Sequence, residues 1–166
     1  PKHAVSSENR LTKGPAFGKT MRLQPRIGDW PTFRGDSARS GHTKQDLNPN
    51  PAKTWETKLG GRLSAVTAAM GKIFVAQIDK HRVHALDENT GEVAWTFTTG
   101  GRVDSPPTFH AGMLIFGSAD GCVYCVEAET GTLAWKFHAA PGVERHMAFE
   151  QLESVWPVHG SVLVQD

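Results

Sequence analysis

Two eleven-residue stretches of this chain are nearly identical, and they lie forty residues apart. The first, ALDENTGEVAW, runs from Ala85 to Trp95, and the second, CVEAETGTLAW, runs from Cys125 to Trp135. The same shift also places Trp55 on Trp95. A repeat of about 40 residues that holds short strands is typical of propeller blades and similar repeat arrays.

Each repeat contains segments in which apolar and polar residues alternate, as they do in strands. In the second repeat these are residues 102–109, 113–119, 122–128 and 132–137, and an Asp-Gly turn separates the second from the third. The first repeat has the matching segments 72–78, 82–87 and 92–97, and Trp55 lies in a further predicted outer strand, residues 53–59. The sequence therefore predicts an all-β chain, a partial β-propeller of four-stranded antiparallel blades with two full blades and flanking partial ones.

The repeated stretch predicts a turn followed by a contact between blades. Asp87 can accept backbone N–H bonds from two or three residues further on, and Gly91 can supply the positive φ that the turn needs. Trp95 then enters the outer strand and offers a large apolar area to the neighbouring blade, while the small Ala85 leaves room for the ring. We therefore expect this stretch to fasten one blade to the next.

The pattern A-x-D-x-x-T-G-x-x-x-W resembles the tryptophan-docking motif of the PQQ-like β-propeller repeat family. That family includes quinoprotein alcohol dehydrogenases and the outer-membrane assembly lipoprotein propeller. The resemblance covers roughly residues 30–166, and segments such as DWPTFRGDSARSGHT are similar to bacterial PQQ-binding-like repeat proteins. The second copy departs from the motif, with Cys125 in place of Ala and Glu127 in place of Asp, so we expect its turn to be less rigid. The structural docking residues are Ala85, Asp87, Thr90, Gly91 and Trp95 in the first copy and Thr130, Gly131 and Trp135 in the second.

Charge divides the chain into two predicted regions. Residues 1–28 hold six Lys or Arg and one Glu without apolar periodicity, which favours a basic, flexible N-terminal linker. Residues 29–166 form the predicted incomplete propeller, with repeats at about 56–95, 96–135 and a partial one at 136–166. Propellers of the family are implied to carry about seven or eight blades. We therefore expect a fragment of a larger propeller, whose remaining blades are its first partners.

Composition excludes some classes of partner. The net charge is +1, so the chain has no overall attraction to nucleic acid, and the longest apolar run, residues 65–70, is too short to span a membrane. No signal peptide is visible, but the resemblance implies a periplasmic or secreted location. The CVYC unit places Cys122 and Cys125 on opposite faces of a strand, so we expect two buried, inert cysteines and no metal site.

An insertion interrupts the repeat near the predicted mouth of the channel. Nine residues lead from Trp95 to Asp104, but twenty-four lead from Trp135 to His159, the position equivalent to Asp104. Long insertions in repeats usually map to a binding face. We expect this one to be ordered, to fold over the mouth and to bring His146 or His159 within reach of Arg102 or Asp104.

The polar residues around the mouth have two interpretations. They could bind an anionic or polyhydroxylated ligand, or they could pair with one another and cap backbone amides. The candidate ligand-binding residues are Arg62, Arg102, Asp104, Arg145, His146 and His159.

The sequence leaves more than one function open. The first hypothesis is a non-catalytic propeller module, acting as a protein-interaction scaffold or as a ligand-sensing part of a larger exported bacterial protein. The alternatives are a fragment of a PQQ-dependent quinoprotein dehydrogenase and a propeller that binds or processes polysaccharide. By the resemblance, such a dehydrogenase needs a calcium ion held by carboxylate and amide oxygens, a carboxylate base and often an adjacent Cys-Cys pair. None of these is recognisable, so we predict no catalytic residue, no metal and no cofactor, with PQQ implied only by the family.

Overall fold

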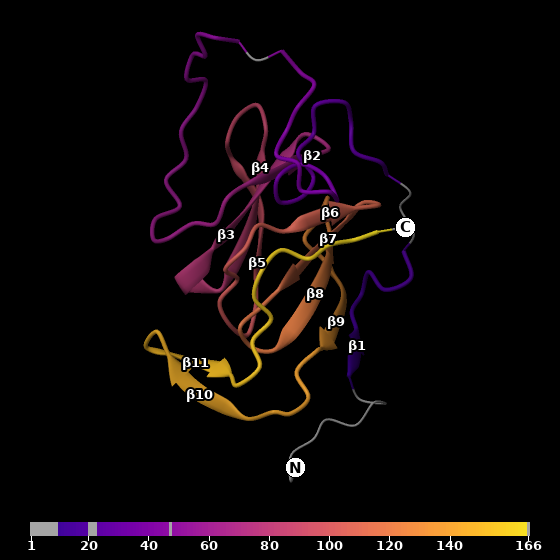
Figure 1. Cartoon of the computed structure of the whole chain (residues 1–166), viewed down its shortest axis with the longest axis vertical. Coiled ribbons are helices and arrows are strands. Elements are labelled where there is room, and N and C mark those ends of the chain that lie inside the picture. Colours follow the sequence, from indigo (N-terminus) through magenta and orange to yellow (C-terminus); the bar gives the residue numbers. More distant parts are fainter. Residues whose placement is uncertain (1–9, 20–22, 47, 166) are drawn as a thin grey trace.

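The first blade is an antiparallel sheet that matches the predicted meander. The computed structural model describes residues 10–19, 23–46 and 48–165. In this structure the first sheet has four strands in the order β2-β3-β4-β5 (Figure 1). A short 3-10 helix, Ile78–Lys80, connects the second and third of them. The strands are β2 (Thr67–Ala69), β3 (Lys72–Gln77), β4 (Arg82–Asp87) and β5 (Val93–Thr98).

The second blade repeats this arrangement and gains a further strand at its outer edge. Its sheet has five strands in the order β1-β9-β8-β7-β6. The strands are β6 (Thr108–His110), β7 (Met113–Gly117), β8 (Cys122–Glu127), β9 (Leu133–His138) and β1 (Leu11–Lys13). Two successive antiparallel meanders confirm the predicted all-β, partial-propeller fold.

One predicted strand begins later than expected, and another is absent. The first strand of the second repeat was expected over residues 102–109, but β6 covers only Thr108–His110. Pro106 and Pro107 have no N–H for a strand ladder, which explains the late start. Residues 53–59 form no strand either, since no strand of the described residues pairs with them.

The expected flexible linker is also wrong over its middle part. β1 pairs antiparallel with β9, from Leu11 opposite Phe137 to Lys13 opposite Trp135. The chain then approaches β9 closely, because the Gly14 N–H donates to the Ala134 carbonyl over 2.8 Å. Residues 1–9 and 20–22 of the expected linker lie outside the described residues. The unpaired outer edge of β9 thus accepts a strand that has no apolar periodicity of its own.

The two sheets pack against each other through large apolar side chains. Phe97 of the first sheet meets Phe116 and Tyr124 of the second edge-on, with ring centroids 6.1 and 5.7 Å apart. Phe74 and Val83 are fully buried in the same cluster. Burying one such side chain contributes about 1.5–3 kcal/mol, so this shared core holds the blades together.

The insertion forms a two-stranded hairpin at one end of the blades. Its strands are β10 (Arg145–Ala148) and β11 (Gln151–Ser154), at the bottom of Figure 1. The connecting residues Phe149 and Glu150 both have positive φ, 51° and 61°, as a two-residue hairpin turn requires. The chain then runs back along the second sheet, where Thr108 Oγ1 donates to the Val162 carbonyl over 2.7 Å.

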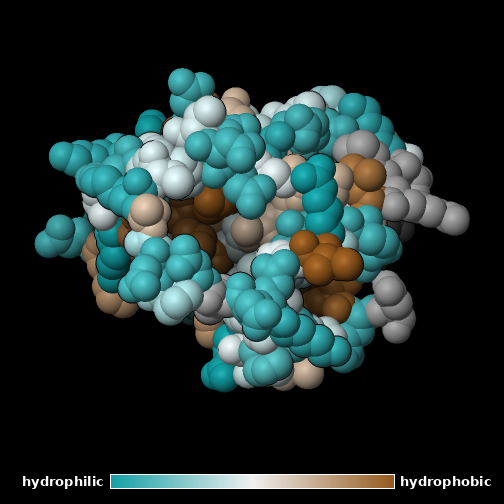
Figure 2. All heavy atoms as spheres, turned by 90° about the horizontal axis from the view of Figure 1, so that it is seen from above, coloured by the Kyte–Doolittle hydropathy of each residue, from teal (hydrophilic) through white to brown (hydrophobic). Residues whose placement is uncertain are grey.

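The opposite end of the molecule has a mostly hydrophilic surface. Figure 2 shows this end from above, where hydrophilic residues predominate and hydrophobic ones appear in a central hollow and in a second patch beside it. The described part of the chain contains no helix long and apolar enough to cross a membrane.

Candidate functional site

Trp55 and Trp95 each lie against the turn of the blade that follows. Trp95 Nε1 donates to the Ala128 carbonyl over 3.0 Å, and a Cβ atom on Gly131 would lie 2.7 Å from the Trp95 ring. Trp55 makes the equivalent contact with the turn of the first blade, over 2.9 Å. Gly131 and Gly91 have φ of +71° and +72°, so both the conformation and the close ring require glycine. The role of these contacts as blade fasteners stays a prediction.

The two turns are stabilised by different carboxylate contacts. Asp87 Oδ1 accepts the N–H groups of Asn89 and Thr90, each over 2.9 Å. These bonds, that of Thr90 foremost, lower the pKa of Asp87 below its ordinary value. Glu127 instead accepts a hydrogen bond from the Thr130 hydroxyl. The carboxylate therefore accepts hydrogen bonds from backbone N–H groups in the first copy and from a side-chain hydroxyl in the second.

A buried ion pair joins the hairpin to the entrance of the second blade. Arg102 precedes the first strand of that blade, and its Nε donates to Glu153 Oε1 on β11. Both residues are almost inaccessible, with 3% and 2% of their surface exposed. The Glu153 hydrogen bond is the foremost cause of a raised pKa at Arg102. Because a buried charge without a partner is costly, the pair fixes where the hairpin lies.

The same network continues to the loop after the hairpin. Arg102 Nη1 lies 3.0 Å from Asp104 Oδ1, and His159 Nδ1 lies 2.7 Å from Asp104 Oδ2. The Phe149 ring covers the guanidinium of Arg102, with 4.2 Å between Cζ and the ring centroid. His159, Asp104, Arg102 and Glu153 thus form one continuous set of polar contacts under the hairpin.

The structure brings three of the six candidate residues together and leaves the others apart. Arg102, Asp104 and His159 are in contact, in agreement with the expected approach of His159 to Asp104. Arg62 pairs with Asp79 over 2.9 Å, on the side of the first blade that faces the hairpin tip. Arg145 and His146 are exposed on β10. The insertion is ordered and lies over the predicted mouth, but a ligand-binding role for the six residues stays a prediction.

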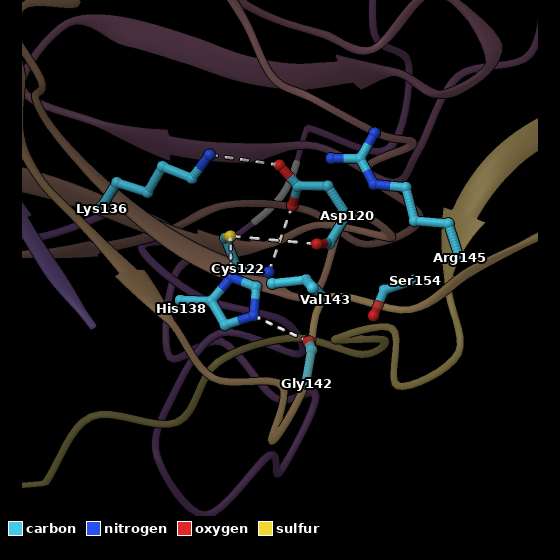
Figure 3. Close-up of a pocket in the computed structure, with 8 residues that line it drawn as sticks. All are labelled: Asp120, Cys122, Lys136, His138, Gly142, Val143, Arg145 and Ser154. Atoms are coloured by element: carbon cyan, nitrogen blue, oxygen red, sulfur yellow. Dashed lines mark hydrogen bonds and ion pairs between the residues drawn. The ribbon is translucent and has the colours of Figure 1, made fainter. Parts of the chain in front are cut away.

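A small polar cavity lies beside the start of β10 (Figure 3). Its volume is about 70 Å³, enough for a few water molecules or one small polar group. Asp120 is held at one side, since its carboxylate accepts the Cys122 N–H and the Tyr124 hydroxyl and lies 3.7 Å from Lys136 Nζ. The lining residues are Asp120, Cys122, Lys136, His138, Gly142, Val143, Arg145 and Ser154.

The cavity contains a cysteine–histidine pair that the sequence did not reveal. Cys122 Sγ lies 3.5 Å from His138 Nδ1, and His138 Nε2 donates to the Gly142 carbonyl over 3.0 Å. Burial, followed by the nearby Asp120, raises the pKa of the Cys122 thiol to about 11. The thiol is therefore neutral at neutral pH and unsuited to nucleophilic attack. The pair could have been predicted from the register of β8 and β9, which places Cys122 opposite His138.

The donor set at the mouth does not fit a bound calcium ion and quinone. In the described ranges, no group of three or more His, Cys, Asp or Glu side chains could hold a metal ion. Asp104 and Glu153, two carboxylates at the predicted mouth, are already paired with Arg102.

Comparisons with known proteins agree with this architecture. A family model described as outer membrane protein assembly factor BamB matches residues 44–164. Outer membrane protein assembly factor BamB of Burkholderia pseudomallei is 30% identical over 111 residues, which are 64% of this chain and 29% of that protein. Quinohemoprotein alcohol dehydrogenase ADH-IIG of Pseudomonas putida is 31% identical over 84 residues, 43% of this chain and 12% of that protein.

A solved structure shows the same fold at lower identity. The quinohemoprotein alcohol dehydrogenase of Comamonas testosteroni is 22% identical, with a TM-score of 0.56 over 72% of this chain and 21% of that protein. The chain spans less than a third of the length of each of these relatives. The family model covers most of the chain, which confirms the resemblance drawn from the docking motif. The chain belongs to the PQQ-like propeller family whose model is described as outer membrane protein assembly factor BamB.

Proposed function

We propose that this chain is a non-catalytic propeller module of a larger exported bacterial protein and that it serves as a scaffold for protein interaction. One observation carries the proposal. The charged groups at the centre of the mouth are paired with one another, since Arg102 contacts both Glu153 and Asp104, and Asp104 contacts His159.

Internal pairing leaves these groups little capacity for catalysis. A general base or nucleophile needs a lone pair directed at a substrate, in a site that a substrate can reach. Glu153 is buried against Arg102, and the Phe149 ring of the hairpin covers the Arg102 guanidinium. The exposed features at this end are instead backbone edges and side chains of β10, which suit contact with another protein.

The location is proposed from the relatives. The Burkholderia relative is named an outer membrane protein assembly factor, which supports an exported protein that works with other proteins. Ligand sensing through the small polar cavity is compatible with the same module. The remaining blades of a parent propeller would be its structural partners.

A second candidate function is a fragment of a PQQ-dependent dehydrogenase. The identity of 31% to the quinohemoprotein alcohol dehydrogenase of Pseudomonas putida favours it. The ion pairs described above oppose it, because Asp104 and Glu153 are already paired with Arg102.

Titration with PQQ and calcium separates the two candidates. We expect no saturable change in absorbance or heat when PQQ and CaCl₂ are added to this chain or to the longest available form of its parent protein. A quinohemoprotein alcohol dehydrogenase freed of its cofactor is the positive control. Saturable binding in the micromolar range, with a calcium requirement, would favour the dehydrogenase and refute the scaffold.

A further inference from the structure

The outer edge of β10 carries backbone groups that pair with no other strand in the described residues. In the hairpin, the Val155 N–H donates to the Glu144 carbonyl, whereas the Ser154 N–H turns away and donates to Ala119 of the second blade. Arg145 lies opposite Ser154 in the register, so its own N–H and C=O also point away from the hairpin. The hydrogen-bonding direction alternates along an antiparallel strand, so the N–H and C=O of Met147, two residues on, also point away from the hairpin.

Within the part of the chain that the structure describes, the hairpin contacts the blades through its β11 edge. β11 lies between β10 and the blades in Figure 1, and its contacts to Ala119 and His81 hold it there. β10 pairs with no strand other than β11 among the described residues. It therefore offers a free edge to which an extended chain can add as a further strand. β1 adds to β9 in this way, so strand addition at a blade edge already occurs in this fold.

The end of the hairpin carries exposed apolar side chains next to this edge. Met147 and Leu152 lie opposite each other, with 68% and 49% of their surface exposed. Phe149 in the turn is 71% exposed, although Arg102 covers one face of its ring. Exposed apolar side chains gathered beside a free strand edge mark an interaction site.

Positive charge lies at the other end of the same strand. Arg145 shares its face of β10 with Met147, two residues away, and lines the cavity that also contains Lys136 (Figure 3). Among the described residues, the Arg145 guanidinium forms no ion pair or hydrogen bond. The Asp120 carboxylate in the cavity is already occupied by Tyr124, Cys122 and Lys136. The cavity therefore has a free cation directed at a space the size of a carboxylate.

These features select one kind of occupant. A second copy pairing through β10 would place Arg145 and His146 near their own counterparts, which like-charge repulsion disfavours. A strand with an acidic residue two positions from an apolar one would instead match Arg145 and Met147 on one face. We propose, building on the scaffold function above, that the β10 edge docks an extended segment of a partner protein with this acidic–x–apolar pattern.

The test uses the full chain and the capped, fluorescein-labelled peptide Thr-Val-Thr-Glu-Thr-Val-Thr, whose palindromic order allows either strand direction. We expect saturable binding by fluorescence anisotropy, with shifts and slowed hydrogen exchange at the backbone amides of Arg145 and Met147. The same peptide with Lys in place of Glu should bind about tenfold more weakly, because it meets Arg145 with a like charge.

Two charge reversals provide matched variants. Arg145→Glu should weaken binding of the Glu peptide about tenfold, whereas Arg82→Glu, an equal change at the exposed first residue of β4, should alter it less than about twofold. The proposal is overturned if the wild-type chain does not bind the Glu peptide, if the Lys peptide binds as well, or if both reversals act alike. It is also overturned if sedimentation shows a dimer that forms through β10, because a second copy of the chain would then occupy the β10 edge. None of these outcomes depends on PQQ, so the docking site and the scaffold function can fail separately.

Discussion

Cys122 and Cys125 lie three residues apart on β8 and face different surroundings. Cys122 contacts His138 and lines the polar cavity, whereas Cys125 packs in an apolar cluster with Ala16 and Ala134. Burial raises the pKa of Cys122 to about 11 and that of Cys125 to about 12. Since an unperturbed thiol has its pKa near 9, folding keeps both in the neutral form up to alkaline pH.

This predicts that both thiols resist alkylation in the folded chain. At about pH 8 only a very small fraction of either is thiolate, so iodoacetamide should react slowly until urea unfolds the protein. As the pH rises toward 11, Cys122 should react before Cys125, because it has the lower pKa and lines a cavity. Mass spectrometry of the wild type and of Cys125→Ser separates the two sites. Rapid alkylation of the native chain at pH 8 would show that the thiols are not buried.

Individual contacts at the mouth were only partly predictable from the sequence. The equivalence of Asp104 and His159 follows from aligned repeats, and these residues do meet. The pairing of Arg102 with Glu153 could not be read from the sequence, because it depends on where the hairpin folds back. The inserted residues show no repeat pattern from which that position could be inferred.

At the scale of the strands, local pattern was a good guide wherever a strand lies between two others. β3, β4, β7 and β8 follow the predicted segments closely because alternation and turn residues agree there. β1 was missed because the pairing requirement of β9, not its own apolar pattern, makes it a strand. Edge strands of this kind depend on distant chain segments, which a local pattern does not contain.

The contact between blades through Trp95 gives a prediction about stability. Its ring packs near Phe74, with centroids 6.2 Å apart, and its indole N–H bonds to Ala128 of the next blade. Trp95→Ala should therefore cost roughly 3–5 kcal/mol of unfolding free energy, as large-to-small core changes do. Trp95→Phe should keep much of the packing and lose mainly the hydrogen bond, about 1 kcal/mol.

Urea melts of these variants of the chain check this prediction. The wild type should be the most stable, Trp95→Phe less stable and Trp95→Ala the least stable. A loss below about 1 kcal/mol for Trp95→Ala would mean that the ring does not fasten the blades.

At the scale of the whole molecule, the hairpin and the blades form one unit through a buried charge pair. Glu153 on β11 and Arg102 at the entrance of the second blade bury their charges against each other. Replacing one partner leaves the other charge uncompensated, whereas replacing both by apolar groups can be nearly neutral. If this ion pair holds the hairpin over the predicted mouth, the stability effects of changing Arg102 and Glu153 should be strongly coupled.

A double-mutant cycle measures that coupling directly. Urea unfolding, followed by tryptophan fluorescence, is compared for wild type, Arg102→Met, Glu153→Leu and the double variant. Arg102→Met should cost roughly 3–5 kcal/mol, because it leaves Glu153 buried without its partner. The double variant should recover at least about 2 kcal/mol relative to the sum of the single changes, the scale of coupling between residues in contact. If the two changes add within about 0.5 kcal/mol, the residues do not interact, and the hairpin is not locked over the mouth.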